Sequence, residues 1–123
     1  MAVRVLIAED EENIAESLSF ILRQAGYEVS GVADGESALR QLRSDPPDLL
    51  LLDVMLPALN GFEVLNKLRA EPGLCNLPVI IVTAKAQLQD RELAASLGVQ
   101  AYVTKPFSNR DVVDIVGRLT RCE

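Results

Sequence analysis

Five polar residues stand at or just after the ends of apolar runs, and their side chains suit the binding of a metal ion and a phosphoryl group. They are Glu9, Asp10, Asp53, Thr83 and Lys105. Neighbouring carboxylates raise one another's pKa unless a cation compensates them. Oxygen ligands suit Mg²⁺, which keeps several waters and accepts phosphate oxygens, while a hydroxyl and an ammonium supply donors to a phosphoryl group. Gathered in one place, these residues would form a magnesium-dependent phosphoryl site.

Each of these residues also has an ordinary structural interpretation when it is taken alone. The acidic run at residues 9–12 is typical of a helix N-terminus, where negative charge is favoured. Asp53 suits the cap of a following turn, Thr83 suits a strand, and Lys105 suits a solvated surface. The joint placement of all five at strand ends favours one site over independent coincidences.

The apolar pattern predicts five strands and five helices in alternation. The strands are expected at residues 3–8, 27–32, 49–52, 78–83 and 101–104. Four helices are expected to end at or before Gly26, Asp45, Glu71 and Gly98, the last of these spanning residues 86–97. Ser108 is the expected N-cap of a fifth helix that runs through Leu119,.

This alternation is typical of an α/β fold in which helices cover both faces of a parallel sheet. The four leucines at residues 49–52 indicate a central strand buried on both faces, so Asp53 directly after them needs a compensating partner,. The carboxyl ends of parallel strands share one edge of the sheet, and ligands bind there. We therefore expect the five polar residues to meet at that edge.

The bulk composition narrows the classes of function. The 123 residues suffice for one domain, and a net charge of −6 argues against direct binding of nucleic acid,. The chain has no histidine, which excludes Ser-His and Cys-His catalytic pairs and the usual zinc ligands,. Two distant cysteines are interpreted as reduced thiols, and no run is long enough to cross a membrane, so we expect a cytoplasmic protein.

Several strings then point to one family. They are Glu9-Asp10, the residues LLLLDVMLP at 49–57 with Gly61 behind them, VTA at 82–84 and YVTKPF at 102–107. In these strings, over essentially its whole length, the chain resembles the receiver domain of two-component response regulators. The resemblance implies a flavodoxin-like (βα)5 fold whose five-stranded parallel sheet has the order 2-1-3-4-5.

The resemblance also implies a chemistry for the strand ends. Asp53 would be the phosphoacceptor, taking the phosphoryl group from a sensor histidine kinase, a histidine phosphotransfer protein or a small acyl phosphate. Mg²⁺, or Mn²⁺, would be held by Asp10, Asp53 and the main-chain carbonyl of Met55, and through water by Glu9. Lys105 and Thr83 would hydrogen-bond the phosphoryl oxygens. The domain would be no enzyme beyond its own phosphorylation and slow autodephosphorylation.

The implied output is a change of surface. Thr83 would move toward the phosphoryl group, Tyr102 would swing from exposed toward buried, and the face formed by residues 86–97, 101–104 and the last helix would change its partners or support a homodimer. The Lys105–Pro106 bond is a candidate cis peptide. We expect no output domain within residues 1–123, which leaves either a stand-alone receiver or a fragment of a longer regulator. The sequence names neither the kinase nor the downstream partner.

Three positions depart from the family pattern or vary within the family. Glu9 replaces the more usual Asp, and its extra methylene could reposition the metal-bound water. Met55 and Lys85 occupy the positions two beyond Asp53 and two beyond Thr83, where family members tune the lifetime of the phosphate. Met55 cannot orient a hydrolytic water by hydrogen bonding, and Lys85 either contacts the phosphoryl group or points to solvent.

Three other classes compete with this interpretation. A magnesium-dependent phosphohydrolase also forms an aspartyl phosphate, but it usually has a second Asp where this chain has Met55. A flavodoxin-like nucleotide or flavin binder would need a phosphate-binding loop after the first strand, where four acids stand instead,. A receiver that works without phosphorylation, as a binding module, is weakly supported by Glu9.

Overall fold

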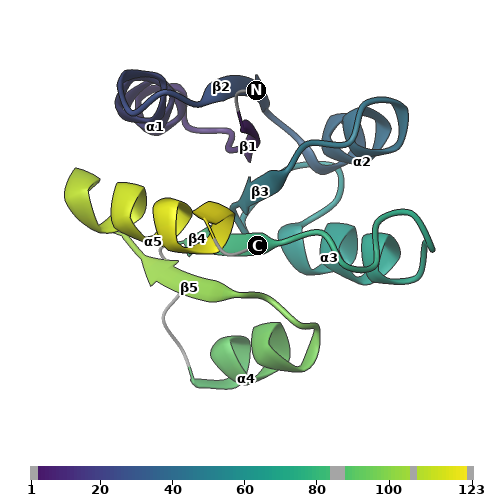
Figure 1. Ribbon diagram of the computed structural model, residues 1–123. Coiled ribbons are helices and arrows are strands. Elements are labelled where there is room, and N and C mark those ends of the chain that lie inside the picture. Colours follow the sequence, from purple (N-terminus) through teal and green to yellow (C-terminus); the bar gives the residue numbers. More distant parts are fainter. Residues whose placement is uncertain (1–2, 84–87, 106–107, 122–123) are drawn as a thin grey trace.

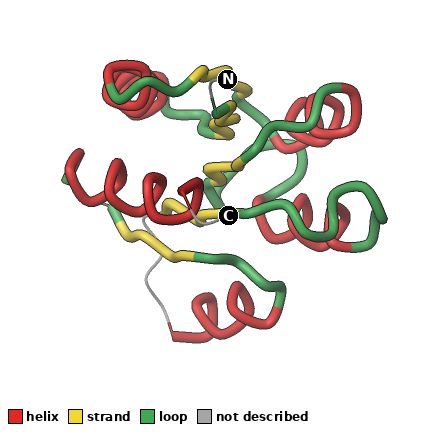
Figure 2. Tube along the Cα trace, viewed as in Figure 1, coloured by secondary structure: helices red, strands yellow, loops and turns green. Residues whose placement is uncertain are grey.

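A computed structural model of the chain describes residues 3–83, 88–105 and 108–121. Strands and helices alternate along the chain (Figure 1), and the first three strands lead through loops into the helices that follow them (Figure 2). The strands are β1 (Arg4–Ala8), β2 (Glu28–Val32), β3 (Leu49–Leu52), β4 (Val79–Thr83) and β5 (Ala101–Thr104). The helices are α1 (Glu12–Gln24), α2 (Gly35–Ser44), α3 (Gly61–Arg69), α4 (Leu88–Ser96) and α5 (Asn109–Arg121).

The five strands form one parallel sheet in the order β2-β1-β3-β4-β5. The expected fold class and strand order are therefore confirmed. In register, Ala8 of β1 pairs with Leu52 of β3, so Glu9 and Asp53 leave the sheet side by side. Thr83 pairs with Thr104 at the ends of β4 and β5, which brings Lys105 to the same edge.

The leucines of β3 alternate between two apolar cores, as a central strand requires. Leu50 and Leu52 pack with residues of α2, α3 and α4 on one face of the sheet, whereas Leu49 and Leu51 pack with α1 and α5 on the other. The two layers of helices are visible on opposite sides of the sheet in Figure 1. Because β3 is enclosed on both faces, the backbone that carries Asp53 has little room to move.

The described helices end close to the residues that the sequence predicted. Gly26 has a φ of 100° just beyond α1, and Gly98 has a φ of 77° just beyond α4. The hydroxyl of Ser108 accepts a hydrogen bond from the amide of Asp111 at 3.0 Å, which confirms Ser108 as the N-cap of α5,. The predicted start of the fourth helix at residue 86 lies outside the described residues, and α4 is described from Leu88.

Candidate functional site

Two carboxylates are built into the carboxyl edge of the sheet by backbone hydrogen bonds. The amide of Asp53 donates to the carbonyl of Ala8 at 3.0 Å, and the amide of Glu9 donates to the carbonyl of Val32 at 3.1 Å. These bonds extend the sheet by one residue beyond β1 and β3. Although both residues are acidic, Asp53 is only 3% exposed and Glu9 only 4% exposed. Two buried carboxylates at one edge need a cation close by.

Lys105 supplies that cation. Its Nζ lies 2.9 Å from Oδ2 of Asp53 and 2.9 Å from Oε1 of Glu9, and the Lys105 side chain is only 11% exposed. The amide of Lys105 donates to the carbonyl of Thr83 at 2.8 Å, so the end of β4 holds the lysine backbone in place. The expected meeting of Glu9, Asp53 and Lys105 at one edge is thus present in the structure.

The electrostatics of this cluster follow from its burial. Desolvation raises the pKa of Glu9 to about 7, although the hydrogen bonds from Lys105 and from the amide of Glu11 act in the opposite direction,. The nearby Asp53 carboxylate adds to the increase. Desolvation lowers the pKa of Lys105, but the bonds to Asp53 and Glu9 outweigh it and raise that pKa overall. The ammonium therefore stays charged while one carboxylate is poised to take up a proton.

Glu9, Asp10 and Asp53 also form a group of oxygen donors that suits a hard divalent ion. One carboxylate oxygen from each lies within 4.8 Å of the others, with Asp10 at the exposed side. Part of the set is already oriented, because Oδ1 of Asp53 accepts the amide of Met55 at 2.9 Å and Oε2 of Glu9 accepts the amide of Glu11 at 3.1 Å. The chemistry of these donors fits Mg²⁺.

Gly61 is the reason that the chain can pass so close behind Asp53. A Cβ at this position would lie 2.5 Å from the carbonyl oxygen of Asp53 and 2.8 Å from Cα of Val54. The Gly61 amide instead donates to the carbonyl of Val54 at 2.9 Å, and Asn60 caps α3 through a capping box with Glu63,. The start of α3 is therefore packed directly against the segment that carries Asp53.

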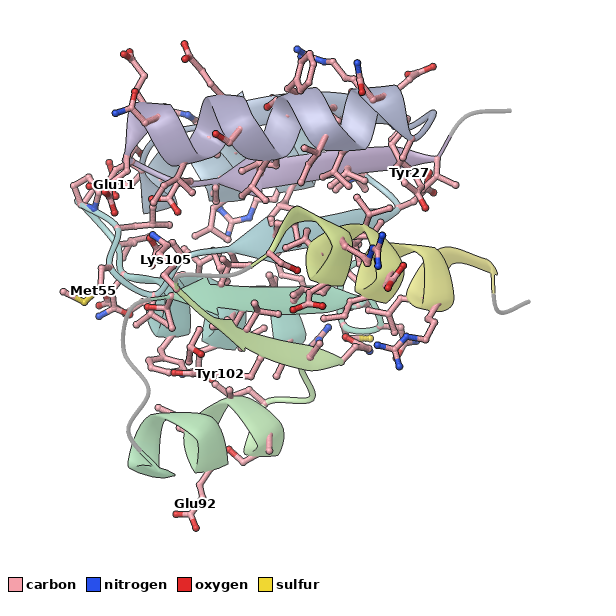
Figure 3. All side chains as sticks on the ribbon, turned by 90° about the vertical axis from the view of Figure 1, so that its left-hand side faces the viewer. Glu11, Tyr27, Met55, Glu92, Tyr102 and Lys105 are labelled. Carbon is pink, nitrogen blue, oxygen red and sulfur yellow. The ribbon has the colours of Figure 1, made fainter. Side chains whose placement is uncertain are left out.

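Thr83 and Tyr102 lie on β4 and β5, the neighbouring strands that position Lys105. Thr83 is completely buried at the end of β4, and Tyr102 is half-buried on β5, where it packs against the core beneath α4 (Figure 3). Met55 is 57% exposed and lies two residues beyond Asp53. Figure 3 shows Glu11, Met55 and Lys105 at one end of the sheet and Tyr27 at the other.

Two of the expected site residues, Lys85 and Pro106, lie outside the described residues, so the cis peptide stays a prediction. The structure adds one contact that the sequence did not single out: Oε1 of Glu11 lies 3.3 Å from Nζ of Lys105. The sequence feature that corresponds to this contact is Glu11, the third acid of the run at residues 9–12. A run of acids at a helix start does not reveal which of its members turns toward a lysine 94 residues away.

Comparison with known proteins decides the family. Residues 5–117 match the response regulator receiver domain. The chain belongs to this family. PhoP, the alkaline phosphatase synthesis transcriptional regulatory protein of Bacillus subtilis, is 42% identical over 112 residues, which cover 91% of this chain and 46% of PhoP. This receiver domain thus spans about half the length of the curated relatives it matches.

Solved receiver domains have the same fold. The receiver domain of the sensor histidine kinase PA1611 from Pseudomonas aeruginosa, solved with a magnesium ion in its active-site cleft, is 32% identical with a TM-score of 0.88. The match covers 97% of this chain and 98% of that one. The BeF3-activated receiver domain of DrrB is 26% identical with a TM-score of 0.88, and the match covers 98% and 99% of the two chains.

Receiver domains are signalling modules rather than conventional enzymes, they bind Mg²⁺ at an acidic pocket and they interact with histidine kinases. The acidic group of Glu9, Asp10 and Asp53 corresponds to such a pocket. Within the three described ranges of the chain, no helix is both long and apolar enough to cross a membrane.

Proposed function

We propose that this receiver domain is a phosphorylation-activated switch in which Asp53 accepts a phosphoryl group. The donor is a phosphohistidine on a sensor histidine kinase or a histidine phosphotransfer protein, because the chain itself has no histidine. The observation that carries the proposal is the contact of one ammonium, that of Lys105, with two buried carboxylates at 2.9 Å each. In this proposal residues 1–123 form one receiver domain that acts in the cytoplasm.

The metal site of the proposal consists of the described acidic group. Asp10, Asp53 and the main-chain carbonyl of Met55 would hold Mg²⁺ or Mn²⁺ directly, and Glu9 would hold it through water. The bound ion would neutralise charge on the phosphoryl oxygens and orient the donor. The hydrogen bonds that Asp53 and Glu9 accept from the amides of Met55 and Glu11 support this role, since they fix the carboxylates before any ion arrives,.

Asp53 is the nucleophile in the proposed phosphoryl transfer. One of its carboxylate oxygens attacks the phosphorus in line with the scissile bond, an O–P bond forms, the P–N bond to the donor imidazole breaks, and the electron pair returns to the imidazole nitrogen. Lys105 then pairs with one phosphoryl oxygen, and the hydroxyl of Thr83 donates to another. Both groups stand at strand ends on the same edge of the sheet as Asp53.

The output would depend on Thr83 and Tyr102, which lie on the neighbouring strands β4 and β5. A phosphoryl group adds charge and acceptor oxygens, which draws the Thr83 hydroxyl inward. The space that Thr83 leaves lets the half-buried Tyr102 move further into the core, and the surface of α4, β5 and α5 changes. This surface would then bind a downstream partner or a second copy of the chain. The similarity to PhoP, a transcriptional regulatory protein, makes control of transcription the favoured output,.

Phosphoryl loading tests the proposal directly. The protein is incubated with Mg²⁺ and acetyl phosphate, and the intact mass is measured; in parallel, beryllofluoride is added and amide spectra are recorded. We expect a covalent phosphoryl adduct and amide shifts near Thr83 and Tyr102. Asp53→Asn should abolish both effects, whereas Asp114→Asn, which removes the same charge from an exposed position of α5, should leave them intact. Absence of any Mg²⁺-dependent change in the wild type would instead support a phosphorylation-independent binding module.

A further inference from the structure

Lys105 contacts a third carboxylate, which lies outside the proposed metal site. Oε1 of Glu11 lies 3.3 Å from Nζ, compared with 2.9 Å for each of the two buried partners. The Glu11 side chain is 64% exposed, whereas that of Lys105 is 11% exposed. An ammonium has three N–H donors. Glu9, Asp53 and Glu11 therefore use all of them in the resting site.

The position of Glu11 in the chain makes this contact unusual. Glu11 is the N-cap residue of α1, with a φ of −84° and a ψ of 110°, and its carbonyl accepts the amide of Ala15 at 3.0 Å. An N-cap side chain normally accepts an amide hydrogen bond from the first turn of its helix. The side chain of Glu11 makes no such bond and reaches across to Lys105 instead. Its amide, bound to Oε2 of Glu9 at 3.1 Å, fixes the backbone from which it reaches.

In the acyl phosphate Asp53 no longer carries a carboxylate charge, so one phosphoryl oxygen can take its place at Nζ of Lys105. A second phosphoryl oxygen can bind Nζ only if the ammonium gives up another acceptor. Glu9 is buried, whereas Glu11 is the exposed partner at the longest distance and can return to water at the lowest cost,. Binding of the second phosphoryl oxygen and release of Glu11 are therefore a single exchange at Nζ.

We propose that Glu11 is a positioning residue that holds Lys105 in the resting site and competes with the phosphoryl oxygens for its ammonium. The proposal rests on the proposed function of Asp53. Glu11 thereby weakens the binding of phosphoryl-like anions and shortens the time for which Lys105 holds them. Exposed ion pairs contribute little energy, so we expect the loss of this contact to tighten anion binding by about two- to fivefold.

Affinity for beryllofluoride in the presence of Mg²⁺ is the first measurement, made on the wild type and on the variants Glu11→Gln, Glu11→Asp and Glu12→Gln. Glu11→Gln removes the charge, whereas Glu11→Asp keeps it on a side chain too short to reach Nζ and well suited to cap α1. We expect both Glu11 variants to bind about two- to fivefold more tightly than the wild type. Glu12→Gln, which removes an exposed charge from the next residue, should match the wild type.

If Glu11→Asp binds like the wild type while Glu11→Gln binds more tightly, general repulsion of anions explains the effect and the proposed contact is wrong. Unchanged binding in both Glu11 variants overturns the proposal as well.

The second measurement needs neither metal nor anion. In Mg²⁺-free protein, the side-chain ammonium signal of Lys105 is recorded in ¹H–¹⁵N correlation spectra, where three acceptors and low exposure slow its exchange with water. We expect this signal to weaken in both Glu11 variants and to persist in Glu12→Gln. An unchanged signal overturns the proposal. If the wild type binds no beryllofluoride, the proposed function of Asp53 fails, while the ammonium signal still decides whether Glu11 holds Lys105.

Discussion

Arg69, the last residue of α3, joins two loops that are distant in sequence. Its guanidinium donates to the carbonyl of Leu97 at 2.8 Å and of Gly98 at 2.9 Å, just beyond α4. It also donates to the carbonyls of Cys75 at 3.0 Å and Leu77 at 2.8 Å, in the segment before β4. Carbonyls at a helix C-terminus lack intrahelical partners. The arginine of one helix therefore caps the end of another.

We predict that Arg69→Met, which keeps most of the apolar stem, lowers the free energy of unfolding by about 2–4 kcal/mol. A hydrogen bond contributes about 0.5–1.5 kcal/mol net, so four bonds amount to about 2–6 kcal/mol. Arg69 is half-buried, and water can replace it at some of the carbonyls, which favours the lower part of that range. A typical domain is stable by about 5–15 kcal/mol, so the variant should still fold.

Urea unfolding of the wild type, Arg69→Met and Arg23→Met provides the test. Arg23 is an exposed arginine of α1 with one bond of the same kind, to the carbonyl of Val29 at 3.1 Å, so its loss should cost about 0.5–1 kcal/mol. Amide hydrogen exchange should accelerate in Arg69→Met at the amides of Gly98 and Val99, which close the end of α4, and change little in β3. Equal destabilisation by the two variants would refute the reasoning.

Three further outcomes are expected. Ala58 has a φ of 69°, in the left-handed region that is costly for residues with a Cβ. Even after the greater chain entropy of glycine is subtracted, Ala58→Gly should therefore raise the free energy of unfolding, measured in urea, by about 0.5–1 kcal/mol. A decrease would contradict this prediction. The folded-state pKa of Glu9, about 7, lies above its ordinary value of 4.5, so the folded state binds more protons between these values and Mg²⁺-free protein should lose stability as the pH rises through them. The difference in urea midpoint between pH 5 and pH 7.5 should therefore shrink in Glu9→Gln, and an identical pH dependence would exclude this group as its source. Met55→Asn places an amide that can orient a water beside Asp53, and dephosphorylation of the loaded protein should become about two- to tenfold faster; equal rates would show that this position does not set the lifetime.

The sequence predicted the fold and the central residues of the site because both depend on local patterns. Four leucines in a row define a strand buried on both faces, and the residue directly after such a strand must lie at the edge of the sheet. Asp53 could therefore be placed without any structure. The same holds for Glu9 and Lys105, because the register of parallel strands brings their ends together.

The sequence could not predict contacts that depend on where a long side chain ends. Glu11 and Glu12 are adjacent glutamates with identical side chains. Only the backbone geometry at the N-cap of α1 decides which of them reaches Lys105. Arg69 looks like an ordinary basic residue at the end of a helix, which the macrodipole favours. Its four acceptors lie 6 to 29 residues further along the chain and meet only after the sheet has formed.

The charges of the site explain why the metal ion and the phosphoryl group would have to act together. With Glu9, Asp10 and Asp53 ionised, these three residues and Lys105 carry a net charge of two negative units, and a phosphoryl dianion alone would meet repulsion in a desolvated place,. A divalent ion held by these carboxylates would neutralise this charge and remove the repulsion toward the donor. With a phosphoryl group on Asp53, the ion, Lys105, Glu9, Asp10 and the acyl phosphate would sum to a net charge of one negative unit. The release of Glu11 from Lys105 would then leave a further exposed carboxylate beside an already negative site, so Glu11 opposes the bound phosphoryl group.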